Sequence, residues 1–156
     1  MSTEVDAGPG LIVVGVDGSD SSANALAWAL EHAASSGMRV RAIACWQALD
    51  SYALAEANVP ESVFEDQAQA RLRQSMDLAA YKRKQTTAAD EAVVVETAVL
   101  RGNPAPTLIE ASKQANLLVV GNRGHGGFIG MLLGSVAQHC AAHSKCPVVV
   151  VHDRES

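Results

Sequence analysis

Short continuous apolar runs alternate along this chain with longer segments in which apolar residues recur every three or four positions. A continuous apolar run at residues 11–16 predicts a strand that is buried on both faces, and the run at 117–120 also predicts a buried strand. Three further strands are predicted at residues 40–46, 92–99 and 147–151. The periodic segments between them predict helices at residues 21–35, 60–84, 105–115 and 136–144. This alternation predicts an α/β fold with a doubly wound, five-stranded parallel sheet and helices on both of its faces.

Local signals support the first two helices. Ser19 or Asp20 can cap the first helix, and Gly37 can end it. The face of this helix that we expect to be buried carries Ala25, Leu26, Ala29, Leu30 and Ala33. Pro60 suits the first position of the second helix. The position of the apolar residues shifts gradually around this helix, and many charged residues lie between them, which predicts one solvated face. The apolar residues are Val63, Ala68, Leu72, Met76 and Ala79.

Composition narrows the class of protein. A chain of 156 residues with 48% hydrophobic content is long enough for one domain, which we place at residues 11–152, after a flexible leader at 1–10 and before a tail at 153–156. The net charge of −5 argues against nucleic acid as a partner. No apolar run approaches the roughly 18 residues of a membrane span, so we expect no membrane partner. The N-terminal residues lack the features of a signal peptide, and an odd count of three cysteines fits the reducing cytoplasm.

The most informative stretch is residues 121–136, with the sequence GNRGHGGFIGMLLGSV. It follows the apolar run at residues 117–120 and leads into the predicted helix at residues 136–144. Glycines let backbone N–H groups approach a ligand because they have no Cβ. The first turn of a helix adds unpaired N–H donors and a partial positive charge. A strand, a glycine-rich loop and a helix start in this order predict a phosphate-binding site.

The spacing inside the loop is specific. Two residues separate Gly121 from Gly124, nine separate Gly124 from Gly134, and Ser135 follows directly. This spacing resembles the nucleotide signature of the universal stress protein family, whereas no Walker-type P-loop or complete G-x-G-x-x-G motif is present. The resemblance covers nearly the whole chain. It includes the segments VGVDGS, RGNPAPTLIEASKQANLLVVG and CPVVVV.

The resemblance implies a Rossmann-like fold, similar to adenine nucleotide alpha hydrolases, with strand order 3-2-1-4-5. In that order the connections reverse between strands 1 and 4, and ligands bind outside the carboxyl ends of strands at such a point. Asp17 follows the first strand and Gly121 follows the fourth. We therefore expect the loop and this carboxylate to meet in one crevice.

The resemblance also implies roles for individual residues around the phosphates. The loop amides and the Ser135 hydroxyl would hold the phosphates, and Val136 would add its amide from the helix start. Arg123 could pair with phosphate or ribose oxygens, or could be a solvated surface arginine. Asp17 would contact the nucleoside or a metal-bridged oxygen, but an aspartate here could also simply cap a turn. His125 could approach phosphate or be exposed.

Other residues would contact the base. Gly15 and Val16 would lie on the adenine side. Ala44 and Cys45 resemble the segment with which the family contacts adenine, and the backbone of Cys45 could read the base edge. Gly102 could border the same crevice.

A metal centre or a fast enzyme is not indicated. Four potential metal ligands lie close in sequence, namely His139, Cys140, His143 and Cys146. Their spacing would not bring the four side chains to one point, as a zinc site requires. Asp17 has no obvious water-activating partner beside the loop, so ATP hydrolysis is predicted to be slow or absent.

Four functions remain open at this point. The first is a regulatory module that binds ATP together with Mg²⁺. The others are a cyclic AMP receptor, a weak ATP hydrolase, and a ligand-free dimeric scaffold, against which the intact loop argues. Separately, the apolar last strand at residues 147–151 should lie at a sheet edge that seeks a partner. The resemblance implies a homodimer in which two such strands pair antiparallel.

Overall fold

A computed structural model of the chain describes residues 8–48, 55–86, 92–124 and 132–153. Five parallel strands form a sheet in the order β3-β2-β1-β4-β5, which confirms the predicted topology. The elements follow one another as β1 (Leu11–Gly15), α1 (Asp20–Ser36), β2 (Arg39–Trp46), α3 (Glu61–Thr86), β3 (Val95–Arg101), α4 (Pro104–Ser112), β4 (Leu117–Gly121), α5 (Ser135–His143) and β5 (Val148–Val151).

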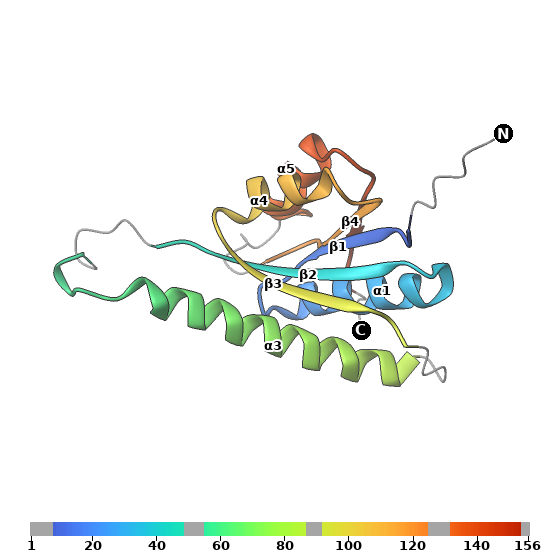
Figure 1. Ribbon diagram of the computed structural model, residues 1–156, viewed down its shortest axis with the longest axis horizontal. Coiled ribbons are helices and arrows are strands. Elements are labelled where there is room, and N and C mark those ends of the chain that lie inside the picture. Colours follow the sequence, from blue (N-terminus) through green and yellow to red (C-terminus); the bar gives the residue numbers. More distant parts are fainter. Residues whose placement is uncertain (1–7, 49–54, 87–91, 125–131, 154–156) are drawn as a thin grey trace.

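Helices cover both faces of the sheet, with α1 and α3 on one side and α4 and α5 on the other (Figure 1). The central strand β1 is buried on both sides because successive side chains point to opposite faces. Ile12 and Val14 pack into the core beneath α1 and α3, and Val13 packs into the core beneath α4 and α5. All three residues are fully buried, as the continuous apolar run predicted.

Helix α1 begins and ends at the predicted signals. The Ser19 hydroxyl caps its first turn by accepting from the Ser22 amide at 3.1 Å. Gly37 adopts a left-handed conformation with φ of 73° and donates its amide to the Ala33 carbonyl. The predicted inner face is confirmed, because its five residues are all buried; they are Ala25, Leu26, Ala29, Leu30 and Ala33.

Helix α3 is 26 residues long and extends past the sheet at its N-terminal end (Figure 1). Val63, the first residue of the drifting apolar pattern, is 38% exposed, two residues after the helix begins at Glu61. Further along, Ala68, Leu72 and Ala79 are buried as predicted. Arg101 at the end of β3 binds Glu61 through two hydrogen bonds of 2.9 and 3.0 Å, which tethers the start of α3 to the sheet.

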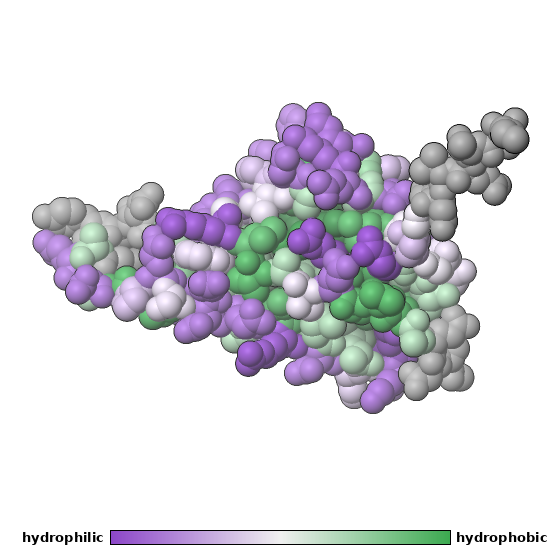
Figure 2. All heavy atoms as spheres, in the orientation of Figure 1, coloured by the Kyte–Doolittle hydropathy of each residue, from purple (hydrophilic) through white to green (hydrophobic). Residues whose placement is uncertain are grey.

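The two edge strands differ in how they are protected. At one edge, β3 carries Glu96 and Arg101, which form ion pairs with Arg39 and Glu61. Figure 2 shows that hydrophilic side chains interrupt the apolar surface on this side of the molecule. At the other edge, β5 consists of four valines and carries no charge. Charged side chains are a common device against edge-to-edge pairing, so β5 is the less protected edge.

The end of β4 packs directly against the start of α1. A Cβ added to Gly121 would lie 2.5 Å from the Ser21 hydroxyl oxygen and 2.8 Å from the Ser21 backbone carbonyl atoms. Because backbone atoms cannot rotate away as a side chain can, only glycine fits at this crossing.

This contact predicts that Gly121→Ala lowers the free energy of unfolding by about 2 kcal/mol or more through overpacking. Chemical denaturation followed by circular dichroism measures the loss. Gly8→Ala is the matched control, because an added Cβ there meets nothing within 4 Å. Equal stability of the two variants would contradict the close packing of β4 on α1.

Candidate functional site

A cavity of about 390 Å³ opens at the carboxyl ends of β1 and β4, beside the start of α5. Its size lies in the range of small-molecule sites. This is where the strand order reverses, because β1 connects onward to β2 on one side and pairs with β4 on the other. The lining residues are Gly15, Val16, Asp17, Ser22, Ile43, Cys45, Arg71, Pro104, Leu108, Val120, Gly121, Arg123, Gly124, Gly134, Ser135, Val136 and Ala137.

Asp17 is held in place by the turn that follows β1. Its Oδ1 atom accepts hydrogen bonds from the Ser19 amide at 2.9 Å and from the Ser19 hydroxyl. Its own amide donates to the Ser22 hydroxyl oxygen at 3.2 Å. Asp17 thus has a structural role in the turn, and its carboxylate also lines the cavity.

The glycine loop approaches this carboxylate closely. A Cβ added to Gly124 would lie 2.9 Å from Asp17 Oδ2, a separation that real Cβ atoms almost never show. The structure therefore brings the β1 carboxylate and the loop after β4 together, as the sequence predicted. Any side chain at position 124 would push the loop away from Asp17 or displace the carboxylate.

Asn122 anchors the base of the loop. It is 6% exposed, and its side-chain oxygen accepts from the Ser21 hydroxyl at 3.0 Å. The Ser21 oxygen in turn accepts from the Arg123 amide at 3.3 Å. The Asn122 carbonyl accepts from the Gly134 amide at 2.7 Å, which joins the start of the loop to its end. Neither Asn122, which lies within the glycine motif, nor Ser21, which lies just after the segment VGVDGS, was assigned to the site from the sequence.

These bonds separate the roles of the motif residues. The Gly134 amide is occupied by the Asn122 carbonyl, so it closes the loop and is not an open donor. By contrast, the amides of Gly124, Ser135 and Val136 donate to no acceptor within the part of the chain that the structure describes. The first helical bond of α5 runs from Gln138 to Gly134, so its first-turn amides remain available at the positive end of the helix.

The β2 end contributes one of its two predicted residues. Cys45 lines the cavity together with Ile43, two positions earlier. Ala44 does not line it, because alternate side chains of a strand point to opposite faces, and Ala44 is buried in the core beneath α1 and α3. Burial raises the pKa of the Cys45 thiol to about 11, against a smaller lowering by its hydrogen bond with Thr107.

Helices α3 and α4 supply walls that the sequence reading did not assign to the site. Leu108 of α4 is 2% exposed and packs so near Gly15 that a Cβ added to the glycine would lie 2.6 Å from the Cδ1 atom of Leu108. Arg71 reaches the cavity from α3. Gly102 is not a lining residue: it adopts φ of 145° in the turn before α4. His125 lies outside the described residues.

The histidines and cysteines near α5 are spread over different surroundings. Cys140 is fully buried in the core, whereas His139 is exposed and its ring contacts the Ser135 carbonyl at 2.9 Å. The ring centroids of His139 and His143 lie 6.3 Å apart. Among the described residues, no three histidine, cysteine or carboxylate side chains converge on a metal position.

Comparison with protein-family models identifies the fold's family. The model described as "Universal stress protein family" matches residues 10–152. The chain belongs to the universal stress protein family. This universal stress protein is 33% identical over 142 residues to Universal stress protein Rv2623 of Mycobacterium tuberculosis, a match that covers 91% of the chain and 45% of that relative. A universal stress protein of Mycolicibacterium smegmatis is 34% identical over 143 residues, covering 92% and 46% respectively.

Solved structures of the same family share the fold. Universal stress protein UspA from Lactobacillus plantarum has a TM-score of 0.68 and 25% identity, covering 93% of this chain and 99% of that one. A universal stress protein solved in complex with cAMP has a TM-score of 0.67 and 31% identity, covering 93% and 98%. This universal stress protein spans about half the length of the curated relatives it matches. None of its described helices is both long and apolar enough to cross a membrane.

The raised pKa of Cys45 predicts slow alkylation. A pKa of about 11 instead of 9.0 leaves about a hundredfold less thiolate at pH 8, and the thiolate is the reacting form. Iodoacetamide labelling followed by peptide mass spectrometry should therefore modify Cys45 slowly at pH 8 and faster as the pH rises toward 11. The urea-unfolded chain is the control. Labelling of Cys45 at the same rate in both states would show that the thiol is not shielded.

Proposed function

We propose that this universal stress protein binds an adenine nucleotide in the cavity, and that the physiological ligand is ATP with Mg²⁺. The observation that carries the proposal is the group of amides at Gly124, Ser135 and Val136, which lack protein acceptors among the described residues and lie beside Asp17. Backbone donors at a helix start favour phosphate. The relative in complex with cAMP supports an adenine nucleotide as the ligand class.

The phosphates would lie between the loop and α5. The three amides and the Ser135 hydroxyl supply neutral donors on one side, and Arg123 supplies a cation from within the loop. Charge-assisted hydrogen bonds to phosphate are stronger than neutral ones. Gly121 and Gly134 contribute indirectly, the first by allowing β4 to pack on α1 and the second by closing the loop.

The adenosine would lie against the apolar part of the cavity. Gly15, Val16, Ile43 and Leu108 form this wall, and the Cys45 backbone lies at its β2 side. Ala44 could contribute only through its backbone, because its side chain lies on the other face of the sheet. Such a wall suits the flat face of a purine, since stacking against apolar side chains releases water.

Asp17 fits a role toward the ribose or a magnesium ion. Mg²⁺ prefers carboxylate and phosphate oxygens, and it is usually held by one or two carboxylates together with the phosphates of the substrate. Asp17 is the carboxylate among the described lining residues. If Mg²⁺ binds, it would neutralise part of the phosphate charge. Without the metal, Asp17 would accept a hydrogen bond from a ribose hydroxyl and would repel phosphates from the end of the cavity that holds the base.

Two other functions remain candidates. The first is binding of cyclic AMP, which is supported by the similar universal stress protein that was solved in complex with cAMP. Slow ATP hydrolysis would need a group that activates water, and Asp17, whose Oδ1 already accepts two bonds from Ser19, is poorly suited to that task. Phosphate release that disappears in Asp17→Asn would support hydrolysis, whereas release at the blank rate would exclude it.

Binding predicts a measurable response to loop substitutions. Equilibrium dialysis with labelled ATP and Mg²⁺ should show saturable uptake, and Gly124→Val or Ser135→Ala should weaken affinity by roughly ten- to a hundredfold by removing donors or displacing them. Gly8→Val is the matched control, because an added Cβ there meets nothing within 4 Å. Competition with cyclic AMP ranks the two ligands. No uptake of either nucleotide at millimolar concentration would refute the proposal.

We also propose that the chain forms a homodimer through β5 and works in the cytoplasm. The four valines of β5 form an uncharged edge strand, and each remains only partly buried. A two-fold axis would pair two such strands antiparallel. The three cysteines are free, which agrees with a reducing compartment.

The dimer predicts a mass of about twice 16.3 kDa by light scattering at micromolar concentration. Val150→Lys should reduce the dimer fraction, because a charge on an edge strand disfavours pairing. Lys145→Arg, an exposed position that keeps its charge, is the control. A monomer mass for the unmodified chain would contradict the proposal.

A further inference from the structure

Helix α3 contributes a cation to a cavity that is otherwise built from strand ends, α1, the loop, α4 and α5. Arg71 lines the cavity, although it lies 50 positions before Gly121 and outside every motif in the sequence. Among the described residues, Arg71 is the one through which α3 lines the cavity.

Two contacts at successive turns of α3 fix the position of Arg71. Gly18 has φ of 82°, and a Cβ added there would lie 3.2 Å from both Cβ and Cγ of Arg71, so the arginine stem lies against the Gly18 backbone. One turn further on, the fully buried Ser75 hydroxyl accepts from the Gly18 amide at 3.0 Å. The helix is thereby held on the turn that carries Asp17.

The charge of Arg71 is not neutralised by an ion pair among the described residues. Five ion pairs form there, and they involve Arg39, Lys82, Arg83, Arg101 and Lys113. Neither Arg71 nor Arg123 belongs to any of them. Among the described residues that line the cavity, two therefore carry guanidinium groups, one on α3 and one in the loop, and Asp17 carries the carboxylate.

We propose that Arg71 is a specificity-determining residue that pairs with the terminal phosphates of a nucleotide and makes the site favour ATP over AMP and cyclic AMP. This inference rests on the proposed function. A single phosphate can be held by the loop amides and Arg123, whereas a triphosphate carries more charge over a longer chain. A second guanidinium, supplied by a different element, adds affinity only where additional phosphate oxygens reach it.

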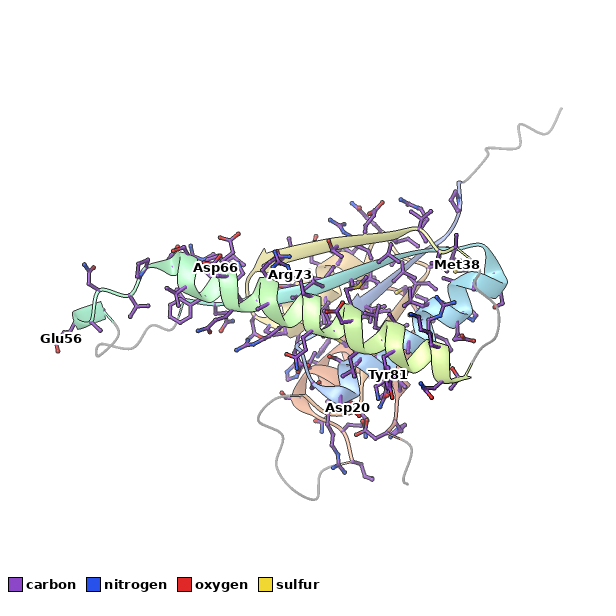
Figure 3. All side chains as sticks on the ribbon, turned by 90° about the horizontal axis from the view of Figure 1, so that it is seen from below. Asp20, Met38, Glu56, Asp66, Arg73 and Tyr81 are labelled. Atoms are coloured by element: carbon purple, nitrogen blue, oxygen red, sulfur yellow. The ribbon has the colours of Figure 1, made fainter. Side chains whose placement is uncertain are left out.

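The same contacts link nucleotide binding to α3. Its outer stripe, which includes Arg73 and Tyr81, faces away from the cavity, and Figure 3 shows these two residues along the helix. Bound polyphosphate would hold Arg71 and so stabilise the central turns of α3 on the Asp17 turn. A nucleotide with one phosphate would not reach Arg71 and so would not change the stability of these turns.

The test compares Arg71→Gln with Arg73→Gln, which removes the same charge from the same helix on the exposed stripe. Isothermal titration at fixed salt and Mg²⁺ measures the Kd for ATP, ADP, AMP and cyclic AMP. We expect Arg71→Gln to raise the Kd for ATP about tenfold, the effect of one exposed charge-assisted pair, and to change the AMP and cyclic AMP values less than twofold. Arg71→Lys should recover part of the loss, and Arg73→Gln should change none of the values.

The outcomes separate this inference from the proposed function. If the unmodified chain binds no adenine nucleotide, the proposed function fails and this inference fails with it. If it binds nucleotide but Arg71→Gln leaves ATP affinity unchanged, or weakens all ligands equally, only the role of Arg71 is refuted. Thermal melts check folding, and Arg71→Met replaces Arg71→Gln if the latter melts early, because methionine keeps an apolar stem over Gly18.

Discussion

The hydrogen bond from the Gly134 amide to the Asn122 carbonyl is the interaction on which the site depends. It joins the two ends of the glycine loop, so α5 begins directly beside the carboxyl end of β4. The Asn122 side chain accepts a hydrogen bond from the Ser21 hydroxyl, and Gly121 packs closely against Ser21, so β4 is fixed against the start of α1. As a result, the first-turn amides of α5 are presented to the cavity next to Asp17. The site is therefore produced by backbone geometry and a few buried polar contacts, with charged side chains added at its rim.

The order of the strands explains why these parts meet at all. Because β1 pairs with β4 while its own connection leads to β2, the turn after β1 and the loop after β4 leave the sheet side by side. The helices on the two faces then close the cavity from opposite sides: Leu108 of α4 narrows it against Gly15, and Arg71 of α3 reaches it past Gly18. The contact between Ser75 and Gly18 couples α3 to the turn that carries Asp17. A ligand that displaces Arg71 or the Asp17 turn would therefore act on α3 through these contacts.

The sequence predicted the architecture well because the strands are buried on both faces and read as continuous apolar runs, such as residues 11–16 and 117–120. It also predicted that Asp17 and the loop converge, since the strand order implied by the family resemblance places the ends of the first and fourth strands side by side. It did not assign Arg71 to the site, because a residue on a long helix enters the cavity only through tertiary packing. Ala44 and Cys45 are adjacent, and only the strand register decides that Cys45 lines the cavity. The apolar pattern of the long helix includes Val63, which is exposed, because periodicity contains no information about where the sheet beneath the helix ends.

Membership of the family accounts for the fold and suggests the proposed ligand class. The amides that have no acceptor among the described residues, those of Gly124, Ser135 and Val136, come from the structure of this chain. The central claim is that phosphate binds to backbone amides at the start of α5 and in the loop. The most direct measurement is a titration of the ¹⁵N-labelled protein with Mg²⁺-ATP, followed by amide chemical shifts. We predict that the amides of Gly124, Ser135 and Val136 shift most, while that of Gly134 shifts less because it donates to Asn122. Saturable shifts confined to other surfaces, with these three amides unmoved, would contradict the account.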